Sequence, residues 1–592
     1  MVSAEFYKQR ANYFQTQADQ LEKTTRQYSF ARLIVAIAVL ILIYFGFQEP
    51  IYFSPAVILV FLFFYLVQRQ IRKEREKEIA ELSAKLNTWE EEATDFRFQN
   101  FSNGKEFIDP HHSYSHDLDL FGDGSLFQYL NRCSTKLGEH RIAKDLTNLP
   151  LNKDEITARQ QAIRELGTLL EFRQLCWAIG EKIQDSKFNL DPLLNWLKQP
   201  ALFFGKNSFR FLQWSLPVIT CAALIGMLLL PDLWILFIPL SFLQVVIASF
   251  YDKPISKLQE ELSRYRVIME NYSRLFDLMG KQKFDSKLLH KHQQIARQAT
   301  DYVRELSKLI NAIESRANMI ARMFGNGLFM YDFHTVSNLE EWRSKHASDL
   351  PQWLESLAEW DALISFATFL YNNSGYVFAH FDESLIIDGK EIGHPLIHSK
   401  VRVANDFSLG NPQNVMLVTG ANMAGKSTFL RAIGVNYILA LNGAPVCALQ
   451  WKCSSASLRT GMRTTDSLKD HESYFYAELN RLHSIIEELR AGKPVIILLD
   501  EILKGTNSND KLSGSRELIK QFINKNALVM IATHDILLGD METQHPHNIV
   551  NTCFEGRIEN DQLLFDYKLN RGLAQRANAT FLMKKMGIIP HG

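Results

Sequence analysis

The sequence lacks an excess of charge of either sign, because Lys and Arg total 65 and Asp and Glu also total 65. A dedicated nucleic-acid-binding protein usually carries a basic excess, so only a local basic patch is compatible with that function. Cysteine is also sparse. The closest pair of the six, Cys447 and Cys453, fits no common zinc spacing, so we expect buried, reduced thiols in the cytosol. The length of 592 residues predicts two or three domains.

Four uncharged apolar runs are present, in two closely linked pairs: residues 33–47 and 51–67, then 214–230 and 233–250. A helix needs about 20 residues to cross the hydrocarbon core, and flanking aromatic or basic residues can extend each run. The pairs predict two transmembrane helical hairpins, at residues 26–70 and 206–252. The alternative is a pair of buried core hairpins. No run has an ionisable residue at its centre, which favours anchors over a transport pathway.

The residues that flank the two predicted hairpins decide their orientation. The turns carry only Gln48, Glu49 and Asp232. The other ends are basic: Arg26, Arg32, Arg69, Arg72, Lys73, Arg75, Lys77, Lys206, Arg210, Lys253 and Lys257. The positive-inside rule therefore predicts a multi-pass protein of the cell (inner) membrane, with both termini and all soluble parts in the cytoplasm.

The soluble parts differ along the chain in their pattern of apolar and β-branched residues. Residues 1–25 predict a cytoplasmic helix, in which "EFYKQR" is a short helix beside the membrane. Residues 71–205 and 253–385 are almost wholly helical in pattern. From residue 386 to 592, short β-branched runs alternate with helices, which predicts an α/β domain with a largely parallel sheet.

The stretch "GANMAGKS" follows an apolar strand, Val415 to Val418, and opens a helix at Lys426. This is the context in which the pattern G-x-x-x-x-G-K-[ST] binds phosphates. Backbone N–H groups would surround the phosphate oxygens, Lys426 would reach the β- and γ-phosphates, and Ser427 would offer its hydroxyl to Mg²⁺. The predicted nucleotide-binding residues are Gly420, Ala421, Asn422, Met423, Ala424, Gly425, Lys426, Ser427 and Thr428.

Two further strands end in residues with suitable chemistry. Asp500 closes the strand in "PVIILLDE" and can hold Mg²⁺ opposite Ser427. Glu501 follows and can polarise the attacking water. The strand in "ALVMIATHD" ends before His534, which can sense the γ-phosphate. Lys426, Glu501 and His534 are the predicted catalytic residues, and the cofactors are ATP and Mg²⁺.

These motifs resemble the ATPase domain of the MutS mismatch-repair family, notably "TGANMAGKSTFLRAIGVNYILALNGAPVCA", "LLDEILKGTNSND" and "IATHD". The stretch from Asp117 to Leu146 is similar to the start of the MutS core. The resemblance implies an ABC-like P-loop ATPase domain and an all-α core and lever domain. It also implies a homodimer through the ATPase domain, in which Ser473 faces the partner's γ-phosphate and residues 507–510 cross the interface. The alternative is that Ser473 only caps its helix.

The chain also departs from the family pattern. Ala421 and Ala424 replace the usual Pro and Gly, and Arg402 stands where an aromatic residue often packs on adenine. We find no counterpart of the mismatch-reading domain before Asp117, of the DNA clamp, or of a domain after the ATPase. We therefore expect a membrane-anchored MutS-like ATPase with weak, non-specific DNA binding at most. The alternatives are a membrane scaffold or protein-partner switch with nucleotide as a latch and, third, an ATP-driven transporter.

The strongest basic stretch lies between Lys281 and Arg297. Its charges could contact DNA phosphates, anionic lipid or only water.

Overall fold

The computed structural model describes residues 3–182, 189–227, 229–410, 412–463, 474–503, 507–559 and 562–575. The chain divides into two compact units. The first contains Met1–Arg132, Glu139–Arg173 and Ala362–Gly592, and the second contains Cys133–Gly138 and Gln174–Asp361. Each unit is therefore built from segments that lie far apart in the sequence.

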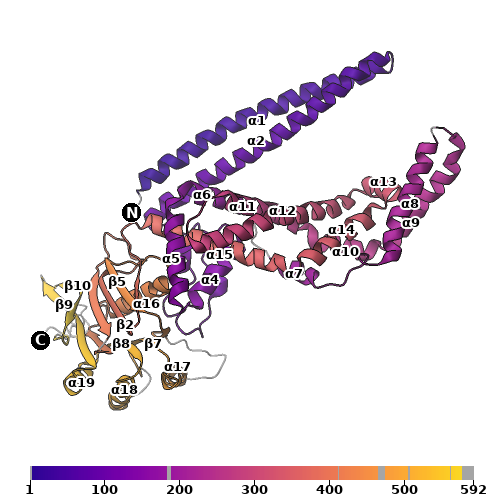
Figure 1. Cartoon of the computed structure of the whole chain (residues 1–592). Coiled ribbons are helices and arrows are strands. Elements are labelled where there is room, and N and C mark those ends of the chain that lie inside the picture. The colour runs from indigo at the N-terminus through magenta and orange to yellow at the C-terminus, as the bar shows by residue number, and fades with distance from the viewer. Residues whose placement is uncertain are drawn as a thin grey trace. The chain divides into compact units, whose positions relative to one another are not determined.

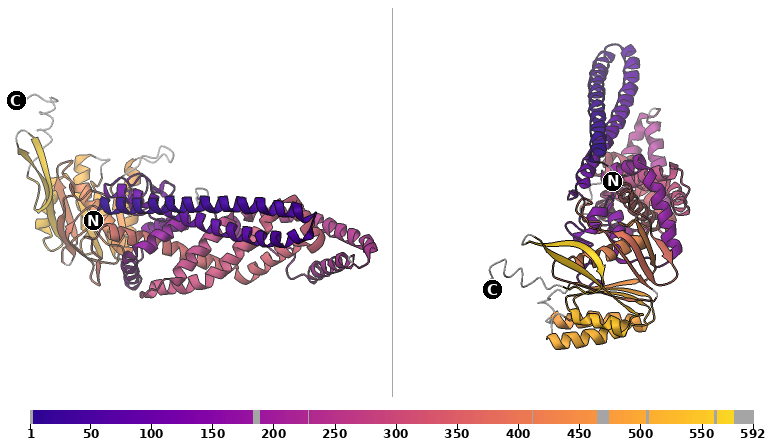
Figure 2. Two further views of the ribbon diagram at one scale, coloured as in Figure 1. Left: turned by 90° about the horizontal axis from the view of Figure 1, so that it is seen from above. Right: turned by 90° about the vertical axis from the view of Figure 1, so that its left-hand side faces the viewer.

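In the first unit, the N-terminal helices form one long hairpin (Figures 1 and 2). Helix α1 (Ala4–Gly46) and helix α2 (Phe53–Thr94) are joined through a short 3-10 turn, η1 (Pro50–Tyr52). The prediction of a short helix at "EFYKQR" is wrong. No glycine or proline interrupts the chain between Ala4 and Phe45, so the helix continues unbroken into the apolar run.

The tip of this hairpin carries large apolar side chains that are exposed along both helices, from Leu33 to Phe47 and from Ile51 to Tyr65. Below the tip, the two helices carry charged residues that pair across the hairpin, with Lys77 Nζ 3.8 Å from Glu22 Oε2. The hairpin therefore has a polar base and an apolar tip.

The second unit is helical in the residues described. Helix α8 (Asn207–Gly226) and helix α9 (Trp234–Phe250) form its apolar hairpin, joined through η3 (Pro231–Leu233). The remaining elements are α7 (Asp191–Leu197), α10 (Asp252–Ser263), α11 (Tyr265–Lys281), α12 (Lys287–Glu314), η4 (Ser315–Ala317), α13 (Met319–Phe329) and α14 (Tyr331–His346). Helix α6 (Leu170–Glu181) enters the unit and α15 (Asp349–Asn372) leaves it.

Among the residues that the structure describes, four helical stretches are, by length and composition, long and apolar enough to cross a membrane: Ala4–Gly46, Pro50–Thr94, Asn207–Gly226 and Pro231–Phe250. The two pairs coincide with the four apolar runs of the sequence. Pro217 lies inside α8 and Pro239 inside α9, a placement that membrane helices tolerate better than soluble ones.

The C-terminal half of the first unit contains two sheets. The larger has the strand order β10-β9-β4-β8-β7-β6. Its neighbours pair in parallel except β9 and β10, which are antiparallel. The predicted largely parallel sheet is therefore confirmed. Its strands are β4 (Val415–Gly420), β6 (Ser457–Gly461), β7 (Val495–Asp500), β8 (Ala527–Thr533), β9 (Ile549–Glu559) and β10 (Gln562–Arg571).

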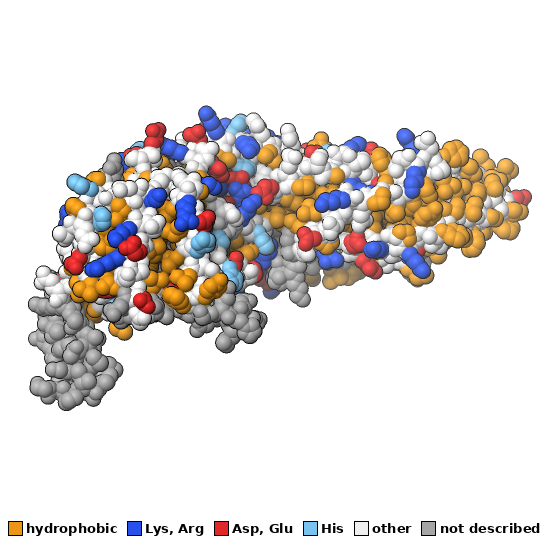
Figure 3. Space-filling model, turned by 90° about the horizontal axis from the view of Figure 1, so that it is seen from below, with side chains coloured by type: hydrophobic (Ala, Val, Ile, Leu, Met, Phe, Trp, Pro, Cys, Tyr) orange, Lys and Arg blue, Asp and Glu red, His pale blue; other side chains and the backbone are white. Residues whose placement is uncertain are grey.

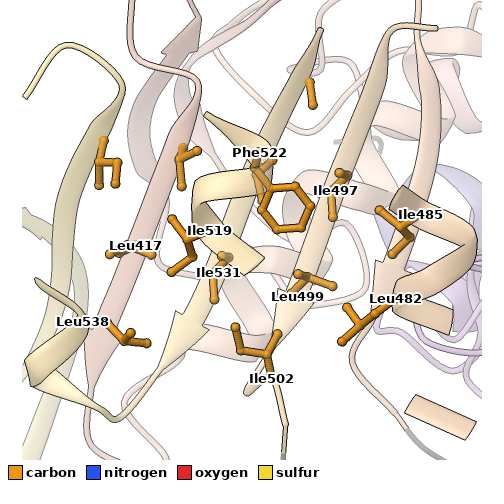
Figure 4. Close-up of a cluster of buried hydrophobic side chains, with 14 of the residues drawn as sticks. Leu417, Leu482, Ile485, Ile497, Leu499, Ile502, Ile519, Phe522, Ile531 and Leu538 are labelled. Atoms are coloured by element: carbon orange, nitrogen blue, oxygen red, sulfur yellow. The ribbon is translucent and has the colours of Figure 1, made fainter. Parts of the chain in front are cut away.

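Helices cover both faces of this sheet because its central strands are apolar on both sides. On one face, α17 (Tyr474–Arg490) and α18 (Ser508–Phe522) pack against alternate strand residues. Figure 4 shows Ile519 and Phe522 of α18 and Ile485 of α17 against Leu417, Ile497 and Ile531. On the other face lies α16 (Lys426–Leu441), whose Gly434 approaches Leu498 so closely that a Cβ would lie 3.0 Å from it.

The smaller sheet has the order β1-β5-β2-β3 and was not foreseen as a separate sheet. Its strands are β1 (His380–Asp382), β2 (Ile386–Ile392), β3 (Asn405–Gly410) and β5 (Gln450–Ser454). The remaining short elements of the first unit are η2 (Lys105–Phe107), α3 (Leu126–Leu130), α5 (Lys153–Thr168), η5 (Ile536–Gly539) and α19 (Asp540–Gln544), together with most of α4 (Lys136–Thr147).

A buried polar network holds the base of the α1–α2 hairpin. Glu90 of α2 pairs with Arg132 at 2.6 Å, and both side chains are at most 5% exposed. Asn372, the last residue of α15, donates to Glu90 at 3.0 Å and accepts from the Tyr7 hydroxyl of α1 at 2.5 Å. One amide thus bridges both helices of the hairpin, and the network fixes the base of the hairpin to the rest of the unit.

Glu90→Ala should lower the thermal unfolding midpoint of the detergent-solubilised protein clearly, because it leaves the Arg132 guanidinium buried without its carboxylate. Such a loss costs about 3–5 kcal/mol. The matched control is Glu171→Ala. Glu171 also pairs with an arginine, Arg10 at 2.6 Å, but its side chain is 73% exposed, and exposed pairs contribute about 0–1 kcal/mol. Equal shifts for the two variants would contradict the structural role of Glu90.

Candidate functional site

The loop between β4 and α16 contains the predicted phosphate-binding stretch. Gly420 has a φ of 149° and Gly425 a φ of 104°, conformations that residues with a side chain rarely adopt. A Cβ on Gly420 would also lie 2.6 Å from the carbonyl oxygen of Phe554. Met423 takes a left-handed φ of 70° without being glycine, and its side chain is 82% exposed. The loop is therefore shaped by two obligatory glycines and one strained residue.

The two alanines of the loop fit this backbone. Neither Ala421 nor Ala424 has a positive φ, so a Cβ costs nothing in conformation at either position. Ala424 is buried and Ala421 lines the adjoining cavity.

Lys426 begins α16 and turns its ammonium back into the loop. Its Nζ donates to the carbonyl oxygens of Gly420 at 2.7 Å and Ala421 at 2.9 Å. Burial lowers the pKa of Lys426, and the charges of Asp500 and Glu501 oppose that shift. The lysine is thus a buried cation that faces two carboxylates across the edge of the sheet.

The predicted acidic residues and His534 meet at the carboxyl ends of β7 and β8. Asp500 is the last residue of β7, and Glu501 donates its backbone N–H to Ala532 of β8 at 2.8 Å. Glu501 then takes a left-handed φ of 56°, which turns the chain. His534 follows β8, and its Nδ1 lies 3.0 Å from Glu501 Oε1. The structure therefore brings Glu501 and His534 into direct contact.

Lys426, Asp500 and Glu501 line a cavity of about 560 Å³, within the range of small-molecule sites. Polar lining is provided by the loop, the start of α16, Asp500 and Glu501. Apolar lining comes from the end of β2 and the segment that follows it, with Ile392, Ile397, Val401 and Val403. The cavity thus combines charged side chains with an apolar wall.

Arg402 takes a different position from the one considered in the sequence. It donates to the Tyr376 hydroxyl at 2.9 Å, and its guanidinium lies 5.6 Å from the centre of that ring. The neighbours Val401 and Val403 line the cavity, and Arg402 is not among the lining residues. Its guanidinium stacks on a tyrosine of the protein, so the idea that it replaces the aromatic residue over a base has no support in this geometry.

The lining residues that the sequence did not reveal include His394, Asn405 and Tyr567. Asn405 joins the two sheets, since its side chain donates to the Tyr567 carbonyl at 3.0 Å and accepts from Leu569 N–H at 2.8 Å. His394 accepts the Leu396 N–H at Nδ1, and burial is the main cause that lowers its pKa to about 4. Tyr567 lies in a strand with no recognisable motif.

Other predicted positions are placed as follows. Asn422, Ser427 and Thr428 line the cavity with the rest of the loop. Asn507 caps α18, with its side-chain oxygen accepting the Asp510 N–H at 2.9 Å, so residues 507–510 form a helix start. Ser473 lies outside the described residues, directly before α17.

A buried carboxylate holds the end of β6. Asp117 is 0% exposed and accepts from the Thr460 hydroxyl at 2.6 Å and from the backbone N–H groups of Met462 and Arg463 at 3.0 Å. Arg481 of α17 pairs with the same carboxylate at 3.1 Å. One residue from the start of the predicted core domain thus fixes both β6 and α17 beside the site.

Comparison with known proteins relates the chain to one family. Residues 416–591 match the family MutS domain V. The DNA mismatch repair protein MutS of Thermotoga neapolitana is 31% identical over 245 residues, which are 40% of this chain and 30% of that protein. MutS protein homolog 4 of Mus musculus is 30% identical over 244 residues, 40% of this chain and 25% of that protein. The matched region is therefore less than a third of either relative.

Proposed function

The chain belongs to the MutS family, and from that premise we propose that it is a membrane-anchored, Mg²⁺-dependent ATPase. MutS domain V is the ATPase domain of the family. ATP binding and hydrolysis would close a homodimer through this domain and move the helical core as a lever. ABC-like architecture of the ATPase domain is part of the proposal.

The observation that carries the proposal is the convergence of Lys426, Asp500 and Glu501 on one cavity. Lys426 begins α16 and interacts electrostatically with Asp500 and Glu501 at the end of β7, and His534 contacts Glu501. A purely structural loop would not require a buried lysine opposite two carboxylates. A triphosphate would supply the negative charge that such a lysine and a helix N-terminus attract.

The residues fit ATP and magnesium. Among the described residues, no three His, Cys, Asp or Glu side chains gather to hold a metal. Mg²⁺, however, is usually held by one or two carboxylates together with waters and substrate phosphates, and Asp500 with the Ser427 hydroxyl would suffice. The ion would neutralise charge on the transferred phosphoryl group.

The protein's own groups would perform the remaining work. The loop N–H groups and Lys426 would hold the phosphates, and the apolar wall near Ile397 and Val401 would accept the base. Glu501 would take a proton from the attacking water. Its contact with His534 would orient the carboxylate and allow His534 to sense the γ-phosphate. Ser473 would complete the site of the partner subunit.

Two hairpins would anchor this ATPase in the cell (inner) membrane with its soluble parts in the cytoplasm. The support is the exposed apolar surface of all four candidate spans together with their basic flanks. A soluble protein rarely exposes such large apolar surfaces.

DNA is a possible partner, since the relatives include proteins named for DNA mismatch repair. With 65 basic and 65 acidic residues, and with Lys281 already paired with Asp277, we propose weak, salt-sensitive binding through phosphates. Phosphate contacts carry no sequence information. A protein partner at the membrane is the alternative target of the lever.

ATP hydrolysis should depend on Lys426 and Glu501 in different ways. Lys426→Ala should weaken nucleotide binding. Glu501→Gln should retain binding but slow turnover by about 10²–10⁴-fold, the usual contribution of general-base catalysis. The measurement pairs steady-state phosphate release with binding of a fluorescent ATP analogue. Wild-type turnover in Glu501→Gln would refute the role of Glu501. Nucleotide binding without any turnover in the unsubstituted protein would favour the alternative, a membrane scaffold or protein-partner switch in which bound nucleotide acts only as a latch.

The dimer should be tested by mixing two inactive variants, Lys426→Ala and Ser473→Arg. In the mixed dimer one composite site keeps both intact halves, so partial ATPase activity should return. Each variant alone provides the matched control. Absence of any recovery, with mixed dimers verified by differential tagging, would argue for a site that is complete within one subunit.

Perfectly paired and mismatched duplexes should compete almost equally for the reconstituted protein, with and without ATP, and binding should fall steeply as salt is raised. The competition is measured at two salt concentrations. A mismatch preference of about tenfold, which is about 1.4 kcal/mol, would show that the protein reads mismatches directly.

A further inference from the structure

Helix α13 of the second unit exposes apolar side chains that no described residue covers. Met319, Ile320, Met323 and Phe324 are each at least 52% exposed, and Phe329 is 54% exposed. The first two turns are apolar around most of the helix, interrupted only by Arg322, and a helix of this kind is normally surrounded by protein or lipid. The sequence analysis treated this region as part of a soluble helical domain.

The helix packs along the second apolar hairpin. Figure 1 shows α13 beside α8 and α9. The absence of a side chain at Gly327 permits the contact, since a Cβ there would lie 2.7 Å from Ser241 Oγ of α9. The Leu328 carbonyl lies 4.0 Å from Cys221 Sγ of α8. Figure 3 shows hydrophobic side chains gathered at the end of the face that this hairpin occupies. The exposed surface of α13 is thus continuous with that of the candidate spans.

Ion pairs place the start of α13 beside the charged end of the α8–α9 hairpin. Arg316 and Arg322 both contact Asp252, at 2.6 and 3.0 Å, and Asp252 follows the end of α9 at Phe250. From Phe250 back to Ser241, α9 rises about 14 Å at 1.5 Å per residue, nearly half of the hydrocarbon core. Helix α13 therefore extends from the charged end of the hairpin to about its midpoint.

The turn after α13 can exist at that depth because the backbone N–H groups of Met330 and Asp332 are hydrogen-bonded within the protein. Met330, with a left-handed φ of 46°, donates its N–H to Asn326. The Asn326 side chain accepts the Asp332 N–H at 2.9 Å. Asp332 in turn pairs with Arg316 at 2.9 Å, and both side chains are 1% exposed. The chain then returns as α14, whose His334 lies 2.8 Å from the carbonyl of Gln213, just before the apolar run of α8.

We propose that α13 is a re-entrant lipid-binding helix, inserted beside the α8–α9 hairpin to about half the depth of the bilayer. With 11 residues, or about 16 Å, it is too short to cross the membrane. This inference rests on the proposed membrane anchoring. Lipid is the expected contact of this face because the face continues that of the α8–α9 hairpin. It also ends at the charged residues Arg316, Arg322 and Asp252, as an interfacial segment does.

The test attaches the fluorophore NBD to a cysteine introduced at Phe324 in full-length protein reconstituted into lipid vesicles. Phe242→Cys on α9, where the side chain is 69% exposed, reports insertion of the hairpin. Asp301→Cys on α12, with an 82% exposed side chain, is the aqueous control. The unsubstituted protein, labelled in parallel, gives the background from native cysteines. Quenching is measured with a doxyl-labelled lipid and with aqueous iodide.

At position 324 the lipid quencher should act about as strongly as at position 242, and iodide should have little effect, with the reverse at position 301. If position 324 were quenched by iodide and not by the lipid, as position 301 should be, while position 242 was still quenched by the lipid, the inference would be overturned and the anchoring would stand. Shielding of 324 from both quenchers would also overturn it and would indicate a protein partner, such as a second copy. Lack of lipid quenching at 242 would refute the anchoring itself.

Discussion

The register of three parallel strands decides where the candidate site forms. Thr419 of β4 pairs with Thr533 of β8, and Asp500 of β7 pairs with Ala532 of the same strand. The residues that follow these pairs, Gly420, Glu501 and His534, therefore lie at one edge of the sheet. A slip of one residue would exchange the faces of a strand and bury the wrong side chains against α16 or α18. The apolar core below the site thus fixes the geometry of its polar edge.

Much of this edge could be predicted from the sequence because its signals are local. Strand, glycine loop and helix follow one another between Val415 and Leu441, and Asp500 directly ends an apolar strand. Local patterns fail where the structure depends on distant segments. Tyr567 lines the cavity from β10, and Asn405 reaches it through hydrogen bonds to that strand. Arg402 is held by Tyr376, a contact that no spacing in the sequence reveals.

In the helical part too, some features follow from local sequence patterns, whereas others depend on packing between distant segments. The apolar runs revealed both hairpins, since 15 or more uncharged residues are a strong local signal. The mixed polarity of α13, with Arg322, Gly325, Asn326 and Gly327 among apolar residues, conceals its exposed surface. Only packing identifies it, because Gly327 and Asn326 are buried while Met319 and Phe324 are not. Likewise, the continuity of α1 follows from the absence of a helix breaker, which is easily overlooked.

The charges at the cavity explain how the loop can hold a buried lysine in a free protein. Lys426 would be costly to bury alone, but two carbonyl oxygens accept from it and two carboxylates oppose the effect of burial on its pKa. A bound polyphosphate would compete with those carbonyls for the same ammonium, and it would repel Asp500 and Glu501 unless a cation lay between them. On the proposed function, this charge pattern favours binding of the nucleotide together with a divalent cation. It also leaves Glu501, held by His534 and by its left-handed backbone, in one fixed orientation at the edge of the cavity.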